Sequence, residues 1–212
     1  MKIQKLTTLL AVITSFAIWA QEPMTPEYAK DAYKTKVGIK AGLNLANQTA
    51  KYNIPETTIQ VSTSTLTTFH MGLYGDFRLS EKAGLLAEVL YSQEGSMVNL
   101  LGIGFKQKVN YIKVPALFSY APLSNGLSFQ LGPQFGFMLK DTIELDNNDG
   151  EDLIDADFKS FEFSAVLGAE YQITQDFKIG ARYNLGITDI SNTDEGTFRN
   201  RNFQCYLGFD IF

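Results

Sequence analysis

The sequence is poor in the residues on which most metal sites and many enzymes depend. It has one cysteine, Cys205, and one histidine, His70, among 212 residues. A single cysteine excludes a disulfide within the chain and any cysteine-based zinc cluster, and a single histidine excludes multi-histidine metal sites. Acidic residues outnumber basic ones by 23 to 18, so the chain has no positive field for nucleic acid. We therefore expect neither a cofactor nor a nucleic-acid partner.

Long apolar runs are also missing, except at the N-terminus. Residues 1–5 form a short basic segment, and residues 6–19 are uncharged and mainly apolar. Ala20 follows and precedes a polar segment. This is the layout of a secretory signal peptide, so we expect residues 1–20 to be removed by cleavage after Ala20. The run is too short for a transmembrane anchor. Residues 21–36 carry two prolines and no periodicity, and we expect a flexible N-terminal lead-in there.

From residue 37 to residue 212 apolar and polar residues alternate, which predicts β-strands with one face of each kind. In one segment, for example, Phe177 and Ile179 alternate with Lys178 and Gly180. The pattern occurs in eight segments: 37–46, 69–79, 83–94, 105–120, 127–139, 161–173, 177–187 and 199–212. Most of them have about ten residues or more, the length that a tilted strand needs to cross a bilayer. A membrane can be spanned without helices only by a closed barrel.

The connections between these segments alternate in length. The short ones are 80–82, 122–125 and 174–176, and the long ones are 46–65, 96–104, 140–157 and 188–198. Transmembrane barrels show this asymmetry, with short periplasmic turns and long outer loops. The threonine-rich connection 46–65 has β character at 59–61, which would extend a hairpin above the membrane. An exposed strand edge there could capture a partner strand.

The alternation does not by itself say which face is outside. A soluble lipocalin-like carrier also has eight antiparallel strands, with the apolar face turned inward. Eight strands, however, enclose a lumen barely wide enough for side chains, which this much Phe, Leu and Ile would overfill. We therefore expect the apolar face to meet lipid and charges of both signs to pair inside the lumen. The expected lumen charges are Lys40, Asp76, Arg78, Glu88, Glu94, Lys113, Glu162, Glu170, Lys178, Arg182 and Asp210.

Four stretches resemble the small outer-membrane β-barrel family common in Bacteroidota, which is often labelled porin-like. They are 37–44 (VGIKAGLN), 88–95 (EVLYSQEG), 110–115 (NYIKVP) and 167–171 (LGAEY). The resemblance implies an eight-stranded antiparallel up-and-down barrel in the bacterial outer membrane, usually without an assigned activity. It also implies that Phe212 is the aromatic C-terminus by which the barrel-insertion machinery recognises such chains. Phe212 nevertheless falls on the polar face with Asp210, unless the strand ends in a bulge or frays.

Two further features suggest chemistry of their own. The segment 141–157 holds eight acidic residues and no basic one, and oxygen-rich loops bind calcium. We expect a solvated outer loop and no metal site, and the weaker alternative is calcium binding by Asp146, Asp149, Asp152 and Asp155. His70 with Ser92 and Glu88 could be imagined as a hydrolase triad, but no nucleophile-elbow sequence supports one.

We therefore expect a non-enzymatic outer-membrane barrel with a filled lumen, which acts in structural support or in surface interaction through its long loops. A wide pore is disfavoured, because aqueous channels need about sixteen strands. The alternatives are a narrow channel for small solutes or ions, and the soluble periplasmic carrier. Expected partners are outer-membrane lipid, the barrel-insertion machinery and a surface or periplasmic protein that the sequence does not identify.

Overall fold

The computed structural model describes residues 35–54, 57–61, 63–100, 103–123, 125–145, 152–154, 159–192 and 196–212. The expected signal peptide and nearly all of the expected lead-in lie outside these residues. Lys36, placed in the lead-in by the sequence, is the first residue of a strand. No helix among the described residues has the length and apolar character needed to span a membrane.

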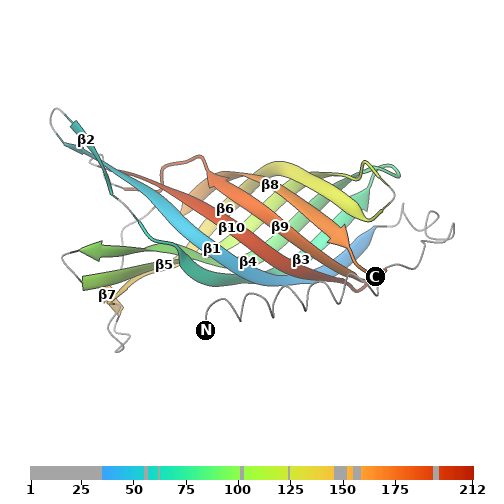
Figure 1. Cartoon of the computed structure of the whole chain (residues 1–212), viewed down its shortest axis with the longest axis horizontal. Coiled ribbons are helices and arrows are strands. Elements are labelled where there is room, and N and C mark those ends of the chain that lie inside the picture. The colour runs from blue at the N-terminus through green and yellow to red at the C-terminus, as the bar shows by residue number, and fades with distance from the viewer. Residues whose placement is uncertain are drawn as a thin grey trace, which may run out of the picture.

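Eight long antiparallel strands form a closed ring (Figure 1). They are β1 (Lys36–Ile54), β3 (Leu66–Arg78), β4 (Ala83–Leu100), β5 (Ile103–Tyr120), β6 (Leu127–Leu145), β8 (Phe161–Gln172), β9 (Phe177–Gly186) and β10 (Gly196–Asp210). Two short strands, β2 (Thr57–Val61) and β7 (Asp152–Ile154), pair only with β1 and β6. The ring closes where β10 pairs with β1, from Gly38 opposite Asp210 to Tyr52 opposite Gly196. The expected up-and-down barrel is confirmed.

The two ends of the barrel differ, as the sequence predicts. The C-terminus and the three short connections, 79–82, 121–126 and 173–176, lie at one end, and β2 and β7 lie at the other (Figure 1). Gly126 has a φ of +85° in one of these turns, a conformation that a residue with a side chain adopts only with strain. In transmembrane barrels the end with the short turns faces the periplasm, so we call this end periplasmic and the opposite end outer.

At the outer end the strands run further than the alternation predicts. The segment 96–104, expected to be a long loop, is a continued ladder in which Leu100 pairs with Ile103. The segment 46–65 contains the end of β1 and the expected β character at 59–61, which is part of β2. The sequence did not predict this continued pairing because both faces of a strand meet water above the bilayer. The alternation of apolar and polar residues therefore fades there, although backbone pairing continues.

The strand β10 ends irregularly. Its last residue is Asp210, after which the amides of Ile211 and Phe212 both donate to the Val37 carbonyl, at 2.8 and 3.2 Å. Ile211 and Phe212 thus both lie opposite Val37. This shift by one residue removes Phe212 from the lumen-facing register that the alternation predicts. Both side chains point outward, and Phe212 is 87% exposed.

The barrel is apolar outside and polar inside. Phe129 and Ile179 are 46% and 41% exposed, whereas Arg182 and Glu170 are 2% and 7% exposed. The lipocalin-like alternative requires the opposite arrangement and is wrong. The sequence did not predict the small apolar cluster in the lumen, which consists of Tyr74, Leu86, Leu117 and Val166.

The cost of a charge on the outer face is expected to depend on depth. Leu167, midway along β8, and Leu79, beside a periplasmic turn, are 60% and 61% exposed. We expect Leu167→Arg to lower the free energy of unfolding in lipid vesicles by about 2–4 kcal/mol, and Leu79→Arg by about 0–1 kcal/mol. Denaturant titration measures both. Equal effects would indicate that both leucines face water.

Candidate functional site: a cross-linked polar lumen

Glu88 lies at the centre of the ion-pair network in the lumen. It projects from β4 and accepts a hydrogen bond from Lys40 Nζ of β1 at 2.6 Å. Arg182 of β9 binds the same carboxylate with two nitrogens, each at 2.7 Å. All three side chains are buried. The planar guanidinium matches a carboxylate in this bidentate geometry, which gives a short and directional contact. One carboxylate therefore joins three strands across the lumen.

Aromatic rings and amides surround this centre. Lys40 Nζ lies 3.9 Å from the centroid of the Tyr206 ring, a distance at which the ring face stabilises the cation. The Tyr206 hydroxyl donates to Glu170 at 3.0 Å, and Arg182 Nε donates to Gln130 at 2.8 Å. These contacts satisfy polar atoms that water does not reach, as buried polar groups require.

A second cluster lies at the periplasmic end. Asp210 pairs with Lys178 at 3.0 Å and with Lys36 at 2.7 Å, and it accepts the Tyr74 hydroxyl. Lys178 also lies 4.4 Å from the centroid of the Tyr74 ring. Because Asp210 is the last residue of β10 and Lys36 the first of β1, this cluster joins the two strands that close the barrel.

A third cluster lies toward the outer end. Lys113 pairs with Glu162 at 2.8 Å and with Glu94 at 3.4 Å. Asn200 and Asn202 donate to these two carboxylates, at 2.6 and 3.3 Å. Two carboxylates thus share one lysine and two amides, and β4, β5, β8 and β10 are joined at this level.

Glycines on neighbouring strands give the large inward side chains their room. A Cβ added at Gly180 would lie 2.2 Å from the ring of Tyr206, and one at Gly136 would lie 3.0 Å from Lys113. Six large side chains each lie opposite a glycine in the strand register: Tyr74 and Gly38, His70 and Gly42, Lys113 and Gly136, Lys178 and Gly208, Arg182 and Gly168, Tyr206 and Gly180. The inward glycines therefore determine at which positions of the lumen a large side chain fits.

The structure brings most of the predicted lumen charges together. Of the predicted lumen charges, Lys40, Asp76, Glu88, Glu94, Lys113, Glu162, Glu170, Lys178, Arg182 and Asp210 are buried, and Arg78 lies at the rim beside Asp76 at 3.2 Å. The prediction did not include Lys36 or the contacts of three inward tyrosines, Tyr74, Tyr111 and Tyr206. The alternation places these tyrosines on the polar face, which is the signal for their inward position.

The imagined hydrolase triad is not assembled. His70 Nδ1 lies 2.7 Å from Asn44 Oδ1, and the Glu88 carboxylate is occupied by Lys40 and Arg182. Ser92 instead contacts Asn44 and Glu94, at 3.1 and 3.4 Å. No pair in this group therefore has the geometry of a nucleophile and its base.

The calcium candidates are placed only in part. Asp146, Asp149 and Asp155 lie outside the described residues, and the backbone of Asp152 lies in β7. Within the described ranges no group of three or more His, Cys, Asp or Glu could hold a metal ion. Cys205 is exposed on the lipid-facing side of β10.

A closed ring of strands with an apolar exterior and a charged, cross-linked interior is the architecture of an integral outer-membrane barrel. The family model described as outer membrane protein beta-barrel domain matches residues 19–192. The chain belongs to this family, and its place is the bacterial outer membrane. No curated protein sequence matches it.

Three of the solved structures that match this chain are as follows. Neisserial surface protein A shares 14% identity over 84% of this chain and 99% of its own, with a TM-score of 0.52. Ail of Yersinia pestis shares 14% over 83% and 99%, with a TM-score of 0.45. OprG of Pseudomonas aeruginosa shares 12% over 84% and 94%, with a TM-score of 0.42. At these identities the likeness concerns the fold alone.

Removal of the central carboxylate is expected to be costly. Glu88→Ala leaves Lys40 and Arg182 buried with their main partner gone, and we expect a loss of about 3–5 kcal/mol in the free energy of unfolding. Glu144→Ala breaks a partly exposed pair with Lys108 and should cost about 1 kcal/mol or less. Denaturant titration in vesicles compares the two. Similar losses would show that water reaches Glu88 as freely as Glu144.

Proposed function

We propose that the protein is a non-enzymatic barrel of the cell surface, with a lumen that does not conduct and outer extensions that interact with a partner. The observation that supports a non-conducting lumen is the buried bidentate contact between Arg182 and Glu88, with Lys40 on the same carboxylate. These side chains occupy the space through which a solute would have to pass.

Two physical features support a closed lumen. The cluster of Tyr74, Leu86, Leu117 and Val166 is almost fully buried, and apolar constrictions block ions by excluding water. The charges around it alternate in sign and are held by each other, whereas selective pores present a ring of one sign. A narrow channel of small conductance is the alternative within the transport class.

The outer extensions support the second half of the proposal. The strand β2 pairs only with β1 among the described residues, from Ala50 opposite Val61 to Ile54 opposite Thr57. Its other edge offers backbone N–H and C=O groups, to which an extended segment of another chain can add. The far end of β4 beyond Val98 likewise pairs only with β5.

The passage of the chain to this location belongs to the same proposal. Export by residues 1–20 with cleavage after Ala20, a lead-in over 21–36, and a barrel domain of the Bacteroidota type over 37–212 are its parts. Phe212, 87% exposed beside the closing strand β1, is accessible to the insertion machinery. The acidic segment 141–157 is proposed as a solvated acidic surface of the outer end, with calcium binding through Asp146, Asp149, Asp152 and Asp155 as the weaker alternative.

We expect the purified barrel to give no conductance steps in planar bilayers across pH and voltage, because ion pairs and apolar contacts fill the lumen. A sixteen-stranded porin inserted under the same conditions serves as the positive control. Reproducible steps from the wild-type protein would establish the narrow channel instead. Cold and heated gel mobility of the same sample verifies that the barrel is closed.

Surface exposure of the extensions is tested by cysteine labelling of intact cells in a Cys205→Ser background. We expect Thr58→Cys, in β2, to react with a membrane-impermeant maleimide added outside. Glu81→Cys, in a turn at the opposite end, should react only after the outer membrane is permeabilised. External labelling at residue 81 and protection at residue 58 would reverse the proposed orientation.

A further inference from the structure

Three basic residues stand on the outside of the barrel, directly above its apolar belt. Arg199 and Arg201 are exposed on the same face of β10 as Phe203. Lys159 is exposed two residues before Phe161, the first residue of β8. Along both strands the next outward side chain toward the periplasm is thus a phenylalanine, so these cations mark the outer edge of the hydrocarbon-facing surface. We call them the basic rim.

The connection between β9 and β10 brings the basic rim together. The Lys159 amide donates to the Ile190 carbonyl at 2.8 Å, and the Ile190 amide donates to the Phe198 carbonyl at 2.9 Å. The Asp189 carboxylate accepts the amides of Ser191 and Phe198, at 3.0 and 2.8 Å. Hydrogen bonds thus link the backbone at Lys159, through Ile190, to Phe198, the neighbour of Arg199.

The basic rim differs from the cations of the lumen in what neutralises it. Within the described part of the chain, every buried lysine or arginine has a carboxylate within 4.0 Å. None of Lys159, Arg199 and Arg201 has such a partner there. Cations at the edge of a bilayer are stabilised by anionic headgroups. The missing anion is therefore expected to come from the membrane.

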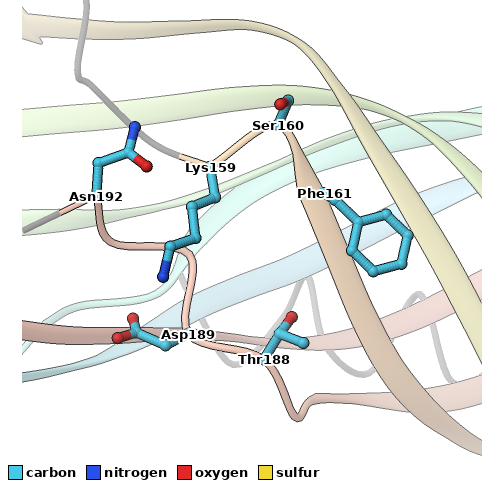
Figure 2. Close-up of a pocket in the computed structure, with 6 residues that line it drawn as sticks. All are labelled: Lys159, Ser160, Phe161, Thr188, Asp189 and Asn192. Atoms are coloured by element: carbon cyan, nitrogen blue, oxygen red, sulfur yellow. The ribbon is translucent and has the colours of Figure 1, made fainter.

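A hollow beside Lys159 offers further polar contacts. It is lined by Lys159, Ser160, Phe161, Thr188, Asp189 and Asn192 (Figure 2). The side chains of Lys159, Asp189 and Asn192 lie on one side of the β8 ribbon, and the Phe161 ring projects on the other side (Figure 2). Asp189 adds one negative charge to the lining, but one of its oxygens already accepts two backbone amides. A ligand that is anionic at one end and apolar at the other fits a site that has polar groups beside Lys159 and a phenylalanine on the neighbouring surface.

We propose that the basic rim binds the phosphate groups of a phosphorylated glycolipid in the outer leaflet. The guanidinium groups of Arg199 and Arg201 bind phosphate oxygens in bidentate geometry, and Lys159 supplies a third charge from β8. The acyl chains of the lipid lie against the belt at Phe161 and Phe203. The inference rests on the outer-membrane location and is independent of whether the lumen conducts.

The test uses the full mature chain in phosphatidylcholine vesicles that contain diphosphorylated lipid A or the same lipid after dephosphorylation. Binding is measured by the lipid retained per barrel after density flotation and detergent exchange. We expect wild-type protein to retain the phosphorylated lipid about tenfold better than the dephosphorylated one, with a preference that falls as salt is raised. The triple variant Lys159→Ala, Arg199→Ala, Arg201→Ala should lose this preference.

Controls separate the basic rim from general charge and from misfolding. Lys82→Ala removes an exposed lysine at the periplasmic turn and should keep the preference. Cold and heated gel mobility shows whether the triple variant still forms a barrel, and if it does not, Arg201→Gln alone should reduce the preference about threefold. A preference unchanged by these substitutions overturns the proposal. Equally tight binding of the soluble phosphorylated disaccharide, without acyl chains, also overturns it and assigns the rim to a soluble anion.

Discussion

The pairing of β1 with β10 is the interaction on which the rest of the structure depends. Inside hydrocarbon no water satisfies backbone N–H and C=O groups, so a sheet with an open edge is not stable there. The ladder from Gly38 to Tyr52 removes that edge, and the ion pairs of Asp210 with Lys36 and Lys178 reinforce it at the periplasmic end. Once the ring is closed, outward side chains within the hydrocarbon region meet lipid, and inward ones meet other side chains.

Closure with only eight long strands explains the character of the lumen. The interior of an eight-stranded barrel is about wide enough for side chains, and charges buried there are stable when other side chains neutralise them. Glu88 meets this condition with two cations, and Lys113 with two carboxylates. The interior thus joins the strands to one another, whereas the edge of β2 and the cations of the basic rim are exposed at the outer end.

The sequence predicted the fold well because the membrane imposes a strict inside–outside contrast on each strand. The eight strands, the turns at one end and the inward charges all follow from alternation. The prediction failed where that contrast ends: residues 96–100 and 103–104 remain paired, and Phe212 leaves the strand register. Partners could not be predicted either, since nothing in one strand's sequence says that Arg182 meets Glu88 or that Lys40 lies over Tyr206.

The contacts of Glu88 also bear on the rate at which the molecule comes apart. Lys40 and Arg182 are 48 and 94 residues away along the chain, so their pairs with Glu88 form only after distant strands have met. Contacts that form late in folding are absent from the transition state and slow unfolding rather than speed folding. We therefore expect the persistence of the barrel to be set by the height of the barrier against opening, more than by the equilibrium between folded and unfolded states.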